Sequence, residues 1–197
     1  MVWAPDYVTS SELKAYLRIT DTVDDAQLAV AISAASRAVD RFAGRQFGVV
    51  DQAEERFFTA RWDRRRCRWT LDVDDLMTAP VSVEVEGGTI TAYDLEPVNA
   101  APKGQPWTSL AVKPGSTVVP TEETNGVAVT ALWGWSTVPV AVKQATLMQA
   151  SRFHSRRDSP YGVAGSPEDG SETRLLATVD PDVKVSLDGY RRRWAAA

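Results

Sequence analysis

Apolar residues recur at helical spacing in the first quarter of the chain. Between Leu28 and Phe42 they follow one another at steps of four and three, in a segment rich in alanine, which predicts one long amphipathic helix. Gly44 stands just past the last periodic residue, as a helix C-cap does. The segment Thr22–Asp25 precedes the helix and has the pattern of a capping box with Asp in place of Glu.

A shorter helix is predicted before it. Thr9 is followed three residues later by Glu12, and a Thr and a Glu at this spacing form a capping box that satisfies two backbone donors at a helix start. We expect this helix to run to about residue 19, with Leu13, Tyr16 and Leu17 on its buried face.

The spacing changes between residues 55 and 135. Segments there are short, rich in β-branched and aromatic residues, and separated by Pro, Gly, Thr and Asn, which is typical of antiparallel strands and loops. Gly87–Gly88 is a hairpin-turn signal. The predicted strands are 56–59 and 68–73, expected to face each other across an arginine-rich loop, then 81–86, 89–91, 110–112 and 127–132.

Helical spacing returns at Val138–Pro139, where the proline suits the first turn of a helix. That helix should end near Arg156. The apolar positions expected on its buried face are Val142, Ala145, Met148 and Phe153. A Ser-, Pro- and Gly-rich stretch follows, and Asp180–Asp182 starts a last short helix that Val183, Leu187 and Tyr190 could dock.

These elements predict an α+β fold. Two N-terminal helices, a long helix near 139–156 and a short C-terminal helix form a small bundle, and a β-rich antiparallel insertion lies between the second and third helices. We expect a single domain over 1–197, with a helical part (1–50), a β-rich part (51–136), a long helix (137–157), a mobile loop (158–178) and a C-terminal helix with its tail (179–197).

Composition narrows the function classes. The chain has 197 residues, of which 44% are hydrophobic and 24% charged, as in ordinary globular proteins. It lacks an apolar run long enough for a membrane helix and a secretory signal pattern at its start. One cysteine excludes an intrachain disulfide, and a net charge of −4 argues against a dedicated nucleic-acid binder.

Few residues suggest chemistry. His154 could be a general base, but no nucleophile motif accompanies it, so we interpret it as a helix-terminal histidine. Cys67 lies among arginines that would lower the pKa of a thiol, yet it is more simply an incidental thiol on a strand. Asp72, Asp74 and Asp75 could bind a hard cation, but the glycine and glutamate of a calcium loop are missing. We therefore expect no enzyme activity, cofactor or metal.

Arginine and tryptophan, which are enriched at protein interfaces, gather in two segments. Three interpretations of the first stay open: a surface that docks an acidic protein, a solvated loop, or a DNA-binding segment that grips phosphates and stacks bases. The second segment has little apolar content to bury, so we expect its deletion to spare folding. The suspected interface residues are Arg61, Trp62, Arg64, Arg65, Arg66, Arg68 and Trp69 in the first segment, and Tyr190, Arg191, Arg192, Arg193 and Trp194 in the second.

The segment Trp133–Pro139, a strand ending in Gly-Trp followed by Val-Pro at a helix start, resembles the head–tail connector (adaptor) proteins of long-tailed bacteriophages. Further segments are similar to that family in the same order along the chain. They are Val8–Leu17, Asp24–Leu28, Ala34–Phe42, Val142–Ala145, Arg156–Gly165 and Asp180–Arg192. The departure is the middle of the chain, 55–126, which is larger than the insert of the simplest members.

The resemblance implies a structural virion protein rather than an enzyme. Such proteins form a ring, typically of twelve copies, beneath the portal protein at the neck between head and tail. The ring extends the DNA channel and docks the next stopper, head-completion or tail protein, while genomic DNA passes without sequence-specific binding. The implied location is the virion neck, after synthesis in the host cytoplasm, with no membrane partner. The alternative function is a nucleic-acid-binding module that uses Arg61–Trp69.

Overall fold

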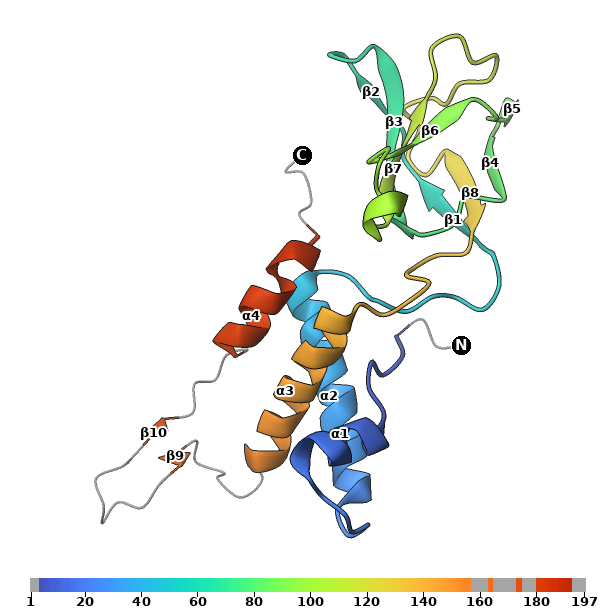
Figure 1. Ribbon diagram of the computed structural model, residues 1–197. Coiled ribbons are helices and arrows are strands. Elements are labelled where there is room, and N and C mark those ends of the chain that lie inside the picture. Colours follow the sequence, from blue (N-terminus) through green and yellow to red (C-terminus); the bar gives the residue numbers. More distant parts are fainter. Residues whose placement is uncertain (1–3, 157–162, 165–172, 175–179, 193–197) are drawn as a thin grey trace. The chain divides into compact units, whose positions relative to one another are not determined.

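The structure is a computed structural model that describes residues 4–156, 163–164, 173–174 and 180–192. It confirms the α+β class, with the β-rich insertion between the second and third helices. The parts expected from the sequence group into two compact units. We call Gly48–Thr137 the β unit, and Ala4–Phe47 with the residues from Val138 onward the helical unit. Each is described by itself (Figure 1).

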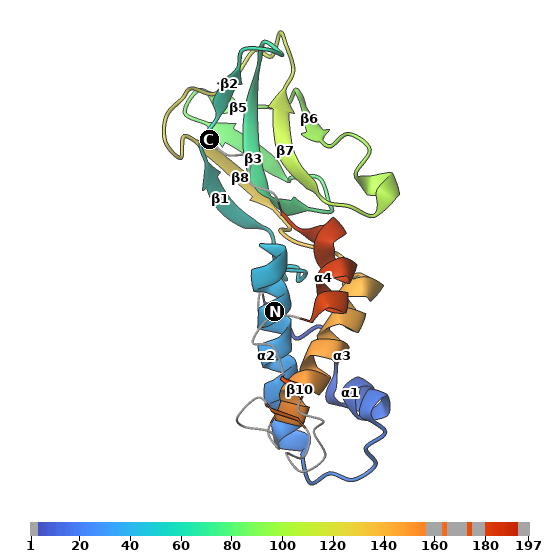
Figure 2. The ribbon, with the colours of Figure 1, turned by 90° about the vertical axis from the view of Figure 1, so that its left-hand side faces the viewer.

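The helical unit consists of α1 (Ser10–Leu17), α2 (Asp25–Ala43), α3 (Val140–Ser155) and α4 (Pro181–Leu187). The helices α2 and α3 run side by side, and α4 packs against α3 (Figures 1 and 2). One core cluster joins α1, α2 and α3. Its fully buried members are Val8, Leu13, Leu28, Ile32, Ala35 and Ala150.

The capping box of α1 is confirmed. The Thr9 hydroxyl accepts a hydrogen bond of 3.2 Å from the Glu12 backbone N–H, and the Glu12 carboxylate accepts one of 2.6 Å from the Thr9 backbone N–H. Leu13 is buried as predicted, but Tyr16 is 45% exposed. The prediction for Tyr16 was wrong because the helix is only two turns long. Leu13 and the half-buried Leu17 make up the side of this helix that packs on the core.

The long helix α2 ends at Gly44, which is in the left-handed conformation as a C-cap. The predicted N-terminal capping box, with Thr22 as the N-cap and Asp25 as its partner, does not form, because the helix begins two residues later. Its N-cap is Asp24, whose φ of −99° and ψ of 10° depart from the extended conformation of a capping residue, and which makes no side-chain capping hydrogen bond.

The β unit contains two four-stranded antiparallel sheets (Figure 2). In the first, the order is β1 (Glu54–Phe58), β8 (Val127–Ala131), β4 (Ser82–Val85) and β5 (Gly88–Thr89). In the second, the order is β2 (Arg61–Asp63), β3 (Arg68–Leu76), β7 (Trp107–Val112) and β6 (Tyr93–Glu96). The loop before β7 contains a short 3-10 helix, Ala101–Lys103.

The two sheets share one hydrophobic core, which is the reason they form a single unit. Leu71, Leu110 and Val112 come from the second sheet, and Val83 and Val129 from the first, and all five are at most 2% exposed. The predicted alternation holds within β4, where Val83 is buried and Glu84 is exposed, but Val81 precedes the strand and is 73% exposed.

Strand pairing differs from the prediction in one respect. Segments 56–59 and 68–73 do not form a hairpin with each other. The strand β1 instead pairs with β8, about 70 residues further along the chain, and β3 pairs with the short strand β2 across the arginine-rich turn. The hairpin β4–β5 is present, with Val85 opposite Gly88, so its two turn residues are Glu86 and Gly87.

The C-terminal segments are described in part. The predicted mobile loop, 158–178, lies outside the described residues except for β9 (Val163–Ala164) and β10 (Thr173–Arg174), which pair antiparallel. The last helix, α4, begins after Asp180, whose side chain accepts a hydrogen bond from the Asp182 backbone N–H. Val183 and Leu187 are fully buried, as predicted.

Candidate interaction surfaces

The arginine-rich segment forms the turn of the β2–β3 hairpin. Trp62 on β2 lies directly opposite Trp69 on β3, and their rings meet edge to face with centroids 5.4 Å apart. Trp69 packs on the β-unit core, whereas Trp62 is 42% exposed. The aromatic pair therefore anchors the hairpin on one side and presents an indole to solvent on the other.

A local network fixes the shape of this turn. The Asp63 carboxylate accepts hydrogen bonds of 2.9 Å and 3.1 Å from the backbone N–H groups of Arg65 and Arg66. The Arg66 hydrogen bond, followed by the Arg65 hydrogen bond and the nearby arginine charges, lowers the pKa of Asp63. Cys67 closes the turn with φ +50° and is an exposed free thiol.

The arginines of the hairpin fall into two groups. Arg66 and Arg68 both contact the Glu96 carboxylate of β6, at 3.3 Å and 2.5 Å. Arg61, Arg64 and Arg65 are exposed, and within the described part of the chain they have no ion pair. The charge available to an outside partner is therefore carried by these three side chains.

The C-terminal tail is partly docked on the helical unit. The Tyr190 ring meets Phe47 edge to face at 6.0 Å, and the Arg192 backbone N–H donates to the Ala43 carbonyl at 2.7 Å, at the end of α2. The Arg191 guanidinium lies 5.2 Å from the centre of the Phe42 ring. The structure places these three residues against the end of α2 and Phe47, and their contact with another chain stays a prediction.

The other two residues of the predicted tail surface, Arg193 and Trp194, lie outside the described residues.

The Trp133–Gly134–Trp135 segment is a structural anchor of the β unit. Both indoles are at most 2% exposed, and their N–H groups donate to the Glu54 carbonyl and to the Asp75 carboxylate, each at 2.8 Å. Asp75 is thus buried as the acceptor of an indole, which the sequence did not predict. A buried tryptophan needs such a partner for its N–H.

Asp72 and Asp74 differ from Asp75. Asp72 is exposed, as predicted, but Asp74 is half-buried and pairs with Arg56 at 2.7 Å. No group of three or more His, Cys, Asp or Glu side chains able to hold a metal ion occurs within the described ranges. No helix among the described elements is long and apolar enough to cross a membrane.

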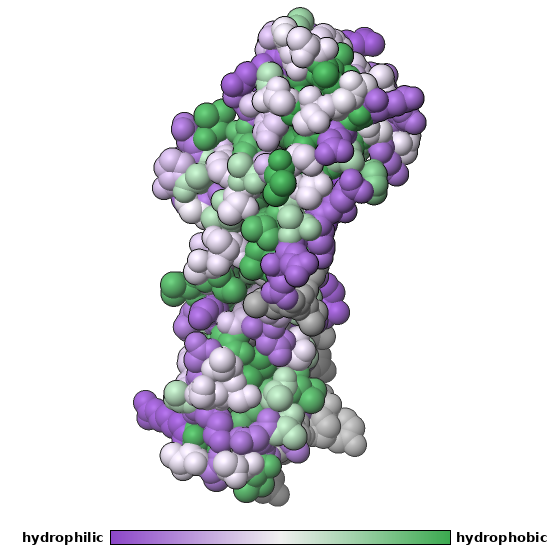
Figure 3. All heavy atoms as spheres, turned by 90° about the vertical axis from the view of Figure 1, so that its right-hand side faces the viewer, coloured by the Kyte–Doolittle hydropathy of each residue, from purple (hydrophilic) through white to green (hydrophobic). Residues whose placement is uncertain are grey.

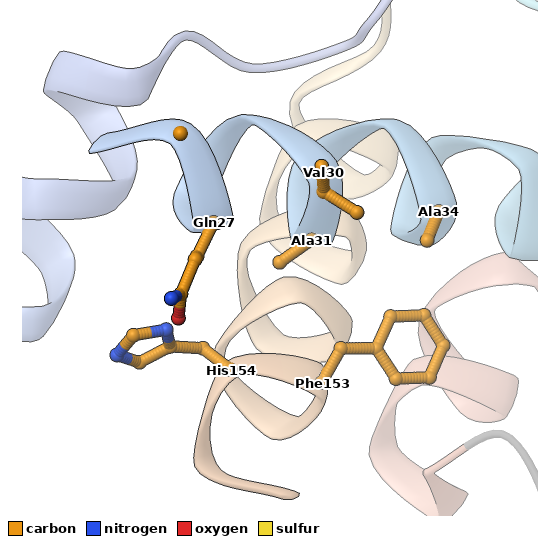
Figure 4. Close-up of a pocket in the computed structure, with 7 residues that line it drawn as sticks. Gln27, Val30, Ala31, Ala34, Phe153 and His154 are labelled. Carbon is orange, nitrogen blue, oxygen red and sulfur yellow. The ribbon is translucent and has the colours of Figure 1, made fainter. Parts of the chain in front are cut away.

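A shallow apolar groove runs between α2 and the end of α3 (Figure 4), with a volume of about 500 Å³. Ala31 and Val30 contribute from α2, and Phe153 and His154 from the last turns of α3. The Gln27 side chain points toward His154. The sequence places His154 at a helix end, which is correct, but it did not indicate that this end borders a groove.

A buried polar network in the helical unit connects Tyr7 with Arg37 and Asp40 of α2 and with Phe47. The Tyr7 hydroxyl donates to the Asp40 carboxylate and accepts from the Phe47 backbone N–H at 3.0 Å, while the Arg37 guanidinium lies 3.0 Å from Asp40. Burial raises the pKa of Asp40, and the Tyr7 hydrogen bond and the Arg37 charge offset part of that rise. Burial, together with Asp40, raises the pKa of Tyr7 as well. We interpret this network as structural, since the partners named here all lie within the helical unit.

No family model matches the chain, and no curated protein is significantly similar to it. What the chain does must therefore be inferred from its surfaces. Three stand out: the arginine hairpin, the outer side of α2 with its groove, and the outer face of the β1–β8–β4–β5 sheet.

Proposed function

We propose that this chain is a structural subunit of a bacteriophage neck, a head–tail connector that assembles as a ring beneath the portal protein. The observation that carries the proposal is the outer side of α2. Ala26, Val30 and Ala34 are exposed at four-residue intervals along it, and Val30 is 70% exposed. This apolar row continues into the groove beside Phe153.

Single exposed apolar residues are common on monomeric proteins and need no explanation. Here they are aligned on one helix, opposite the side that Leu28 and Ile32 bury in the core. Alanines at such positions let a second helix approach closely, because interaxial distance depends on the side chains at the contact. In a ring each copy would present this surface to a different surface of its neighbour, which is the arrangement that closes a cyclic oligomer.

The order of elements also supports the proposal. The capped helix α1, the long helix α2 and the helix α3 that follows Val138–Pro139 occur in the order in which the connector-like segments occur in the sequence. The ring would extend the DNA channel below the portal and dock the next neck or tail protein. A chain with net charge −4 suits a channel through which DNA slides.

A second candidate function is nucleic-acid binding through the hairpin. The observation that favours it is the exposed indole of Trp62 beside the arginines without ion pairs, since bases stack on aromatic rings while arginines contact phosphates. The charge of the rest of the β unit disfavours it. Outside 61–68 that unit has three basic and twelve acidic residues, which would repel a phosphate backbone.

Imaging of the particle tests the neck proposal most directly. Cryo-electron microscopy of virions that contain this chain should show it as a ring next to the portal. Val30→Glu should prevent assembly of the ring on purified portal, because it places a carboxylate in the apolar row between neighbouring copies. Val185→Glu is the matched control, since Val185 is an 80% exposed valine on α4 of the same unit. Virions without the chain at the neck would refute the proposal.

A further inference from the structure

The outer face of the β1–β8–β4–β5 sheet carries a second surface of unusual composition. Residues opposite each other in an antiparallel pair share a face, so Phe57, Ala128 and Glu84 lie in one row across β1, β8 and β4. Glu55 lies on the same face, two residues before Phe57. We call Glu55, Phe57 and Glu84 the acidic–aromatic patch.

This patch is open to solvent. Phe57 is 57% exposed and both glutamates are exposed. Ala128 between them is small, so Phe57 and Glu84 border the same shallow area although they lie two strands, roughly 10 Å, apart. Within the described residues neither glutamate has an ion pair. Figure 3 shows that apolar and polar side chains are mixed on the exposed surface of the β unit.

The tip of the β2–β3 hairpin is the counterpart of this patch. It presents an exposed aromatic ring, Trp62, next to the turn that carries Arg64 and Arg65, whose charges are unpaired among the described residues. Arg61 precedes Trp62 on β2, so its side chain points to the other face of the hairpin. One surface is thus an aromatic ring flanked by carboxylates, and the other an aromatic ring flanked by guanidinium groups. The opposite charges around the two rings attract the two surfaces at long range, and the rings can stack on each other once the surfaces meet.

The two surfaces lie on different sheets of one unit, so a tip and a patch can meet only when they belong to different copies. Each copy then uses its tip toward one neighbour and its patch toward the other. We propose that the hairpin tip of one copy docks on the acidic–aromatic patch of the next copy in a head-to-tail contact. The partner is a second copy of this chain, because the complement of each surface is present on every copy and five of the eight basic residues of the β unit lie in 61–68.

The inference rests on the proposed function, since a head-to-tail contact closes into a ring or continues as a filament. It assigns to the β insertion a defined task, which is to join neighbouring subunits outside the helical unit. The contact is electrostatic in part, so it should weaken with salt, because the screening length falls from about 10 Å at 0.1 M to about 3 Å at 1 M.

Nuclear magnetic resonance of the full chain can test the contact residue by residue. With rising concentration at low salt, signals of the hairpin tip and of the patch should shift together, and high salt should reverse the shifts. Reversing the tip, Arg64→Glu with Arg65→Glu, should weaken self-association about tenfold or more. Lys103→Glu with Lys113→Glu makes the same change in net charge on exposed lysines of the same unit and should leave it unaltered.

One mixing experiment and one combined variant decide the geometry. A labelled tip variant mixed with an unlabelled patch variant, Glu55→Arg with Glu84→Arg, should shift only at its own patch, because its tip is disabled and its partner supplies an intact one. The chain with all four reversals should self-associate again, since both surfaces have exchanged charge. Retained spectral dispersion shows in the same measurement that each variant is folded.

The contact is refuted if concentration leaves both surfaces unshifted, or if the four reversals fail to restore association. Tip shifts with double-stranded DNA in place of a second copy would also overturn it, in favour of a nucleic-acid partner. None of these three results decides the neck proposal, which particle imaging tests. Failure of the head-to-tail contact can therefore be distinguished from failure of the neck proposal.

Discussion

Gly134 offers the sharpest test of how the β unit is built. Its φ is +110°, a conformation that favours glycine. The backbone around it is held on three sides: the Gly134 N–H donates to the Asp75 carbonyl at 2.7 Å, the Trp135 N–H to the Gly48 carbonyl at 2.9 Å, and the Trp133 carbonyl accepts from the Val50 N–H at 3.0 Å. The chain therefore cannot rotate to a relaxed φ without breaking one of these hydrogen bonds.

The expected cost of Gly134→Val follows from this geometry. A residue held in a sparsely populated backbone region costs about 1–3 kcal/mol, and a β-branched side chain should lie at the upper end. Escaping the strain by giving up a hydrogen bond would cost about 0.5–1.5 kcal/mol and would displace one of two buried indoles. A loss of 1 kcal/mol lowers the melting temperature of a 60–100-residue domain by about 4–8 °C, so we expect a fall of at least several degrees.

Tryptophan fluorescence during thermal unfolding is the appropriate assay. Five of the seven tryptophans, Trp62, Trp69, Trp107, Trp133 and Trp135, lie in the β unit, so the signal reports mainly on its unfolding. Gly87→Ala is the matched control, because Gly87 has no positive φ and a Cβ there would meet nothing within 4 Å. A Gly134→Val chain that melts together with the wild type and the control would refute the strain argument.

Two other changes probe the helical unit. A chain truncated after Gly189 should unfold with a free energy roughly 1–3 kcal/mol lower than a chain truncated after Arg192, because it lacks the aromatic contact of Tyr190 and the hydrogen bond of Arg192. Urea denaturation measures the difference, and equal stability of the two truncated chains would contradict the docking. Burial raises the pKa of Asp40 in the folded chain, so the contribution of its protonation to the free energy of unfolding is fully present below the ordinary aspartate pKa and is lost as pH rises through the raised value. Asp40→Asn should abolish this decline in stability. A variant with the same dependence of stability on pH as the wild type would contradict the assignment to Asp40.

The helices could be predicted because their signals are local. The capping box of Thr9 and Glu12, the apolar stripe of α2 and the glycine that ends it each lie within a few residues of the structure they specify. The failed helix-start prediction has a local cause too. Thr22 and Asp25 have the spacing of a capping box, but residues 22–25 form a turn, and the helix begins only after it, with Asp24 as its N-cap.

The pairing of the strands could not be predicted in the same way. The strand β1 is a short segment that precedes the arginine turn, and the nearest long strand in sequence is β3. Its actual partner is β8, because Phe58 then faces Val127 and packs with Trp133 in the shared core. Alternation tells which face of a strand is buried, but it does not tell which other strand will share that face. The short strand β6 was missed because each of its residues is only half-buried.

The same limit applies to the candidate interfaces, where counting charges in the sequence overstates what an outside partner can meet. Five arginines crowd 61–68, but Glu96, about thirty residues away, neutralises two of them. Of the three that are left, Arg64 and Arg65 lie in the turn next to the exposed indole of Trp62, which contacts Trp69 edge to face. A partner must therefore match a small basic surface built around one aromatic ring, and not a long basic strip. A duplex offers phosphates at many positions along its length, whereas the acidic–aromatic patch offers carboxylates around one ring, which is why the docking of a second copy accounts for the arrangement better than DNA does.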